Sequence, residues 1–230
     1  KTLLMAANIL YLYKKGYRDF LFFVNSTNII EKTRDNFLNP NSSKYLFSEK
    51  IKFEDEKVRV NNVENFEASN DGDINIIFTT VQGLHSHMNT PKENTLTYED
   101  FKDKKIVFIS DEAHHINAWT KNRLNKDESL AKTTWEYTVE RIFNANTKNI
   151  MLEYTATVDL EHSAIYEKYQ NKIIYEYSLK EFRQDGYSKE VKVLQADLDN
   201  IDRMLQAIIL SQYRRKNAEK KFPAARNRQI

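Results

Sequence analysis

The stretch of the chain with the densest titratable chemistry is residues 108–117, FISDEAHHIN. It follows an apolar run, KIVFI at residues 105–109, that has the length and composition of a buried strand. At the end of such a strand Asp111 can bind a hydrated Mg²⁺, and Glu112 can orient or deprotonate a water molecule. Three interpretations are open: the acidic strand end of an ATP-hydrolysing motor, a helix that starts with polar residues, or a metal-dependent hydrolase that uses Asp111, Glu112, His114 and His115.

Length and composition limit these interpretations. The chain has 230 residues, enough for one complete domain and part of a second. Its formal net charge of +2 is too small to indicate a generally basic surface, so any site for a polyanion must be a local groove. The absence of cysteine from the sequence excludes disulfides, thiol catalysis and thiolate zinc sites. Since neither a signal peptide nor an apolar run of membrane-spanning length is visible, we expect a cytoplasmic protein without membrane contact.

Apolar runs of strand length alternate with helical stretches along the chain. The predicted strands are residues 19–24, 74–78, 105–110 and 149–154, and the predicted helices are residues 2–16, 27–38 and 129–146. Each strand ends in a polar cluster, which indicates a parallel sheet whose strand ends line one edge, where ligands bind. Residues 39–73 show only weak alternation, and we expect them to form an inserted, partly β region.

The residues Lys1 and Thr2 stand directly before the first helix. A Lys-Thr pair alone carries little information. Beside an Asp-Glu strand end about a hundred residues later, it is typical of the last two residues of a phosphate-binding loop, G-x-x-x-x-G-K-[ST].

These motifs together resemble a known family. Residues 111–114, DEAH, resemble motif II of superfamily 2 helicases, and residues 155–157, TAT, resemble their motif III. The wider strings SDEAHHINAW and MLEYTATVD are similar to the Res (restriction) subunit of type III restriction enzymes and to related DEAH-box proteins. The resemblance covers about residues 1–197. It implies an α/β, RecA-like parallel sheet flanked by helices at residues 1–188, and an incomplete start of a second RecA-like domain at residues 189–230.

The resemblance also implies roles at an ATP site. Lys1 would contact the β- and γ-phosphates of ATP, while Thr2 and Asp111 would hold Mg²⁺. Glu112 would be the general base or would position the attacking water. His114 would relay the nucleotide state to the turn after the next strand.

Two further groups of residues match coupling and DNA-contacting motifs. Thr155 and Thr157 match the turn that couples hydrolysis to domain movement in the family. The positions that match motifs Ia and Ib, which contact the DNA backbone, are Ser26, Thr27, Thr79, Thr80 and Gln82. Hydroxyls and backbone N–H groups at helix starts suit phosphates, although the same residues can simply cap helices.

The implied function is the ATP-dependent translocase or helicase motor of a type III restriction enzyme, with DNA as substrate and a methyltransferase (modification) subunit as partner. A DEAH-box helicase unattached to restriction is an alternative within the same chemistry. The metal-dependent hydrolase is an alternative of another class, but it explains neither Lys1 and Thr2 nor the turn at Thr155.

Overall fold

The computed structural model describes residues 1–53, 56–90, 96–113, 126–156, 158, 160–188, 197 and 199–221, with backbone alone for 126–133 and 164. The chain divides into two compact units, residues 1–173 and 174–230. This division lies earlier in the chain than the predicted domain boundary at residue 188, which stays a prediction. Within the described residues, no helix is both long and apolar enough to cross a membrane.

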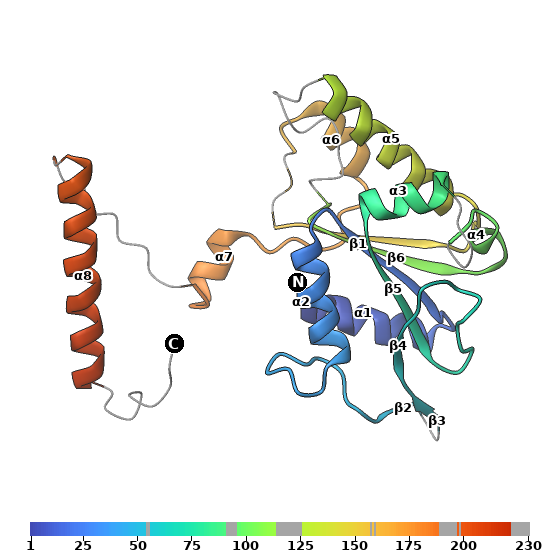
Figure 1. The fold of residues 1–230 in the computed structure, drawn as a ribbon, viewed down its shortest axis with the longest axis horizontal. Helices are drawn as coiled ribbons and strands as arrows, with labels where there is room; N and C mark the ends of the chain where they lie inside the picture. Colours follow the sequence, from blue (N-terminus) through green and yellow to red (C-terminus); the bar gives the residue numbers. More distant parts are fainter. Residues whose placement is uncertain are drawn as a thin grey trace. The chain divides into compact units, whose positions relative to one another are not determined.

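The first unit is built on a five-stranded parallel sheet with the strand order β4-β5-β1-β6-β7 (Figure 1). Its strands are β1 Asp19–Val24, β4 Val60–Asn62, β5 Ile74–Thr80, β6 Ile106–Asp111 and β7 Ile150–Tyr154. The four strands predicted from apolar runs are confirmed as β1, β5, β6 and β7. We call the side where these strands begin the amino edge and the side where they end the carboxyl edge.

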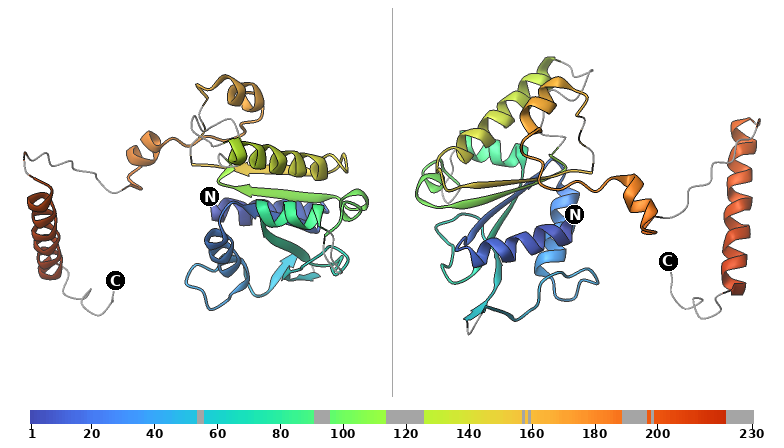
Figure 2. Two further views of the ribbon diagram at one scale, coloured as in Figure 1. Left: turned by 45° about the horizontal axis from the view of Figure 1, so that its top comes forward. Right: turned by 180° about the vertical axis from the view of Figure 1, so that it is seen from behind.

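Helices cover both faces of this sheet. The helices of the first unit are α1 Thr2–Lys14, α2 Thr27–Leu38, α3 Val81–Asn89, α4 Asp100–Asp103, α5 Lys126–Phe143 and α6 Ser163–Tyr169. Buried residues of α1 and α2 share one core with one face of the sheet, while those of α3, α4 and α5 share a second core with the other face (Figures 1 and 2). Both cores are rich in phenylalanine, and four of the six residues of β1 are fully buried aromatic or leucine side chains.

The first helix ends as its sequence predicts. α1 stops at Lys14, and Gly16 adopts a φ of 87°, in the left-handed region that glycine enters without steric cost. The turn sends the chain directly into β1. This places Lys1, at the N-cap of α1, and the end of β1 on the same edge of the sheet.

Residues 39–73 are partly β, as expected, but they are not all an insertion. β2 Ile51–Phe53 and β3 Glu56–Val58 form a separate antiparallel pair. β4, in contrast, pairs in parallel with β5 and is the edge strand of the main sheet. Its three residues, VNN, contain no apolar run, which is why the pattern did not separate it from the surrounding polar sequence.

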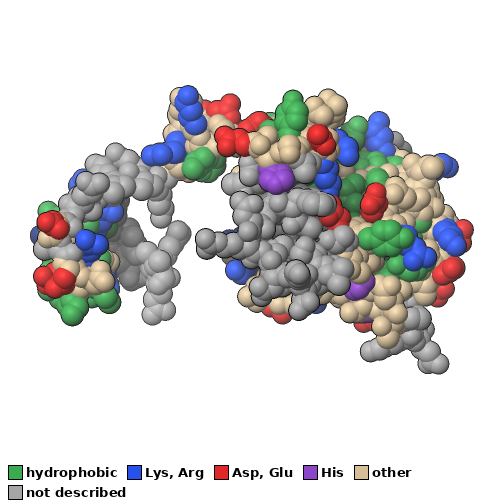
Figure 3. All heavy atoms as spheres, turned by 90° about the horizontal axis from the view of Figure 1, so that it is seen from above, with side chains coloured by type: hydrophobic (Ala, Val, Ile, Leu, Met, Phe, Trp, Pro, Cys, Tyr) green, Lys and Arg blue, Asp and Glu red, His purple; other side chains and the backbone are tan. Residues whose placement is uncertain are grey.

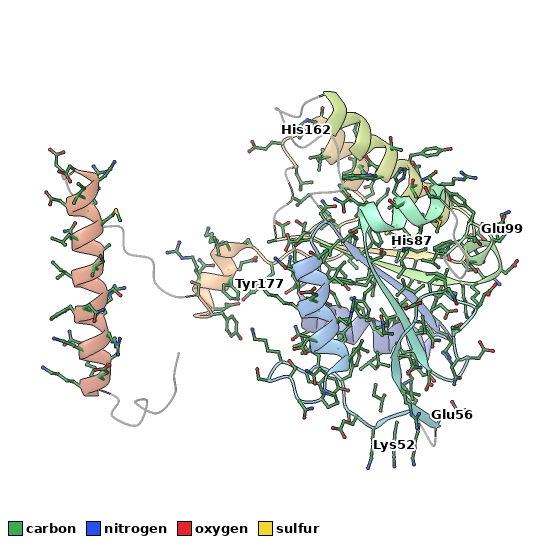
Figure 4. The ribbon with its side chains drawn as sticks, in the orientation of Figure 1. Lys52, Glu56, His87, Glu99, His162 and Tyr177 are labelled. Atoms are coloured by element: carbon green, nitrogen blue, oxygen red, sulfur yellow. The ribbon has the colours of Figure 1, made fainter. Side chains whose placement is uncertain are left out.

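The second unit contains two described helices, α7 Leu179–Gln184 and α8 Asn200–Lys221. None of the described residues of α8 is buried, and hydrophobic side chains lie on its surface in Figure 3. Tyr177, labelled in Figure 4, donates a hydrogen bond to Asp185 across α7. That this unit is the start of a second RecA-like domain stays a prediction.

Candidate active site

The carboxyl edge brings Lys1 onto both acids of the strand end. The Lys1 ammonium lies 3.0 Å from Asp111 Oδ1 and also donates to Glu112 Oε1, a residue 111 positions away in the chain. Asp111 is the last residue of β6, and its side chain is only 9% exposed. Fold geometry therefore joins the Lys-Thr start and the Asp-Glu strand end that the sequence suggested belong together.

The charges at this point stabilise one another. Burial lowers the pKa of Lys1, but hydrogen bonds to Glu112 and Asp111 and the two negative charges outweigh it and raise the pKa above 10.5. Lys1 therefore stays an ammonium ion, and it lies between carboxylate oxygens. A site that holds one cation on hard oxygen donors suits Mg²⁺, which prefers the same ligands.

The backbone at Glu112 adopts an unusual conformation. Glu112 has a φ of 52°, and no other non-glycine residue in the described part of the chain has a positive φ. Its N–H donates to Asp111 Oδ1 at 2.8 Å, which fixes the turn that follows β6. The left-handed conformation costs a non-glycine residue about 1–2 kcal/mol, and such residues cluster at functional sites.

The residues matched to DNA-contacting motifs follow two neighbouring strands. Ser26 and Thr27 come after β1 and begin α2, while Thr79, Thr80 and Gln82 stand at the junction of β5 and α3. β1 lies between β5 and β6, so these residues share the carboxyl edge with the two acids.

Helix capping accounts for one of these groups better than for the other. The Thr80 hydroxyl accepts a hydrogen bond from the N–H of Gly83 at 2.9 Å, so it caps α3. A Cβ at Gly83 would approach the hydroxyls of Thr79 and Thr80 to 3.0 Å, which explains the glycine. Ser26 occupies the N-cap position of α2, but its side chain makes no capping hydrogen bond.

The residues matched to the coupling motif are only partly described. Thr155 follows β7 directly and is partly buried. Thr157, His114 and His115 lie outside the described residues. Within the described part of the chain, no group of three or more acidic or histidine side chains is arranged to hold a metal ion.

Sequence reasoning missed several polar groups at this edge. Asn8 of α1 donates a hydrogen bond to the hydroxyl of Tyr154 at 2.6 Å, and Tyr154 pairs in register with Asp111. Asn8 is the only amide or charged residue between Leu3 and Tyr13, a signal that could have identified it.

Two other missed groups carry buried oxygens. Asn25 Oδ1 and Ser110 Oγ have no hydrogen-bond partner among the described residues. Asn25 follows β1 and Ser110 precedes Asp111 on β6, so both lie at the carboxyl edge.

The sequence of the chain matches a known protein family. The family model described as type III restriction enzyme, res subunit, matches residues 1–160. The chain belongs to this family. The parallel sheet between two layers of helices is the RecA-like α/β fold expected of a Res domain.

A relative of this Res chain is known from Haemophilus influenzae, where it is named probable type III restriction-modification enzyme HindVIP Res subunit. The two are 40% identical over 237 residues, covering 96% of this chain and 46% of the relative. The chain thus spans about half the length of the curated relative it matches. No solved structure matches it.

Proposed function

We propose that the first unit is the ATP-hydrolysing motor domain of a type III restriction enzyme, and that it uses hydrolysis to move along DNA. The observation that carries this proposal is the contact of Lys1 with Asp111 and Glu112. A lysine at a helix start and two acids at the end of an adjacent buried strand are the groups that ATP hydrolysis needs in one place. Family membership and the name of the relative support the same chemistry.

In this proposal the two acids have different tasks. Asp111 and the hydroxyl of Thr2 would hold Mg²⁺, and the metal would neutralise charge on the phosphates when bound. Glu112 would position the attacking water or accept its proton. Its partly exposed carboxylate suits this task, because its side chain is 24% exposed while that of Asp111 is 9% exposed.

The ion pair of Lys1 would be the resting state of this site. In this state the two carboxylates balance the positive charge of the Lys1 ammonium until the phosphate groups of ATP bind. ATP would supply negative charge for Lys1, and its metal would supply positive charge for Asp111. The exchange keeps every charge paired, so it avoids leaving a partly buried charge without a partner.

DNA would lie along the carboxyl edge near Ser26, Thr27, Thr79, Thr80 and Gln82. The Thr80 hydroxyl already caps α3, so at this position the backbone groups of Thr80 and its neighbours would bind the DNA phosphates. The Ser26 hydroxyl is not used in capping and could bind a phosphate directly. We further propose a methyltransferase (modification) subunit as partner, in line with the relative's description as a restriction-modification enzyme. The coupling turn would include Thr155 and Thr157, with His114 as the relay.

The test is Mg²⁺-dependent ATP hydrolysis by the full-length protein, with and without DNA. We expect Asp111→Asn to lose both metal-dependent nucleotide binding and turnover, because a neutral amide is a poorer ligand for a hard cation. Asp103→Asn is the matched control, since Asp103 is exposed at the end of α4. Turnover that survives Asp111→Asn, or that is lost equally in Asp103→Asn, contradicts the assignment.

A further inference from the structure

The carboxyl edge contains a polar contact that the proposed chemistry does not use. Asn8 Nδ2 donates to the hydroxyl oxygen of Tyr154 at 2.6 Å, across 146 positions of the chain. Asn8 is on α1 and Tyr154 is the last residue of β7, so the bond joins two elements that do not follow each other in sequence. Both side chains are partly buried.

Each end of this bond is tied to a different part of the proposed motor. Asn8 lies on the helix that begins at Lys1 and Thr2, about 10 Å along the axis from Lys1 at 1.5 Å per residue. Tyr154 immediately precedes Thr155 on the chain. The bond is therefore a short physical connection between the phosphate-binding end of α1 and the coupling turn.

The two elements are rigid enough to transmit a displacement. Met5 and Ile9, on either side of Asn8 along α1, are fully buried in the first core. The ring of Tyr154 packs against that same core. Since close-packed interiors deform little, a shift at the start of α1 is carried to the Asn8 side chain and from there to Tyr154.

Tyr154 also lies beside Asp111. It pairs in register with Asp111 across β6 and β7. Burial raises the pKa of the Tyr154 hydroxyl, the hydrogen bond from Asn8 lowers it, and the charge of Asp111 raises it further. The hydroxyl therefore keeps its proton and is a neutral group within the field of Asp111.

We propose that Asn8 and Tyr154 are a positioning pair that couples nucleotide occupancy at Lys1 to the turn at Thr155. This inference rests on the proposed function, because it assumes that Lys1 leaves the acids when ATP binds. In that event α1 and β7 move as one body, and the backbone of Thr155 follows. Without the bond, the site can still bind ATP. The segment at Thr155 then no longer moves together with the start of α1.

The experiment measures the ratio of DNA-stimulated to basal ATP turnover in the full-length protein, together with KM for ATP. Tyr154→Phe removes only the hydroxyl, and Asn8→Ala removes its partner. We expect either change to lower the ratio by about 2- to 30-fold, the usual range for positions that carry coupling, with a smaller change in KM. The double variant should be no worse than either single variant, because both remove the same bond.

Tyr13→Phe is the matched control for a purely structural role. The Tyr13 hydroxyl donates to the carbonyl of Gly72 at 2.7 Å, from the far end of the same helix. Its loss should lower the urea midpoint about as much as Tyr154→Phe and leave the turnover ratio unchanged. A ratio that stays at the wild-type value in Tyr154→Phe and Asn8→Ala, or that falls equally in Tyr13→Phe, overturns the inference.

Glu112→Gln, assayed in parallel, separates this inference from the proposed function. If Glu112→Gln abolishes turnover but Tyr154→Phe keeps the ratio, only the positioning pair is wrong. If Glu112→Gln hydrolyses ATP normally, the proposed active site is wrong, and the pair falls with it.

Discussion

The two edges of the central sheet both contain buried polar residues, but they satisfy them differently. At the amino edge, Asn75 is fully buried and uses both ends of its amide, donating to the carbonyl of Asn70 at 2.9 Å and accepting from its N–H at 3.1 Å. At the carboxyl edge, Asn25 Oδ1 and Ser110 Oγ have no hydrogen-bond partner among the described residues.

The amino edge also contains an ion pair and further hydrogen bonds. Lys104 lies 3.6 Å from Asp19 Oδ2 and donates to the carbonyl of Phe66 and the hydroxyl of Ser69. Asn149 similarly accepts from the N–H of Ile106 at 2.8 Å. These contacts tie the starts of β1 and β6 to each other and to neighbouring loops. The carboxyl edge instead has the left-handed Glu112 and the ion pairs of Lys1 with Asp111 and Glu112, so the contacts that stabilise the sheet lie at one edge and the proposed active site lies at the other.

The largest expected effect tests the proposed active site at the carboxyl edge. Glu112→Gln keeps the size of the side chain but removes its charge and basicity, so ATP turnover by the full-length protein should fall about 10²-fold or more. Glu99→Gln is the control, because Glu99 lies beside α4 at the other end of the sheet (Figure 4). Equal turnover in the two variants would remove the distinction between the edges.

The second expected effect tests the structural edge. Asn75→Ala removes the acceptor of the Asn70 N–H and one of the donors to the Asn70 carbonyl and to the Asp19 carboxylate, so we expect a loss of about 1–3 kcal/mol in the free energy of unfolding. Urea denaturation measures it. Asn39→Ala also removes side-chain hydrogen bonds, but from an exposed loop, and should cost less than about 1 kcal/mol. Similar losses in both variants would show that the buried hydrogen bonds of Asn75 stabilise the fold no more than exposed ones do.

The smallest effect is a pH dependence at the same edge. Burial raises the pKa of Asp19, and Lys104, Ser69 and Asn75 offset this only in part. The folded state therefore holds the proton to a higher pH than the unfolded state, whose pKa is 3.8. The contribution of Asp19 to stability is present below 3.8 and is lost as pH rises through the folded pKa.

Removing the Asp19 charge should flatten this dependence. Between pH 3.8 and the folded pKa of Asp19, the free energy of unfolding of Asp19→Asn should rise relative to that of the wild-type protein as pH increases. Urea denaturation at a series of pH values measures the difference, with the exposed Asp71→Asn as control. A difference that shrinks with rising pH would mean that the Lys104 pair outweighs burial.

The sequence predicted the parts of the fold that depend on burial. Runs such as FLFFV in β1 are apolar because both faces of a parallel sheet are covered, and this makes them visible in one sequence. β4 could not be predicted in this way, because it is a three-residue edge strand without an apolar run and is stabilised by its pairing with β5. Its place depends on a neighbour 14 positions away, Ile74 opposite Val60, which local patterns do not contain.

The candidate site was predicted as motifs and not as contacts. The motifs placed Lys1 and the acids at strand and helix ends, since ligand-binding residues of parallel sheets follow that rule. Asn8 and Tyr154 were missed because a hydrogen bond between a helix and a distant strand leaves no periodic signal. The roles of all the matched residues stay predictions, and His114 and Thr157 also lie outside the described residues.

The most direct test of the account is a structure of the full-length protein with Mg²⁺ and a non-hydrolysable ATP analogue. We expect the Lys1 ammonium to leave Asp111 and Glu112 for the β- and γ-phosphates, and Asp111 and Thr2 to hold the metal. A nucleotide bound elsewhere while Lys1 still contacts both acids would contradict it. So would a metal held by His114 and His115, which would make this edge the site of a metal-dependent hydrolase.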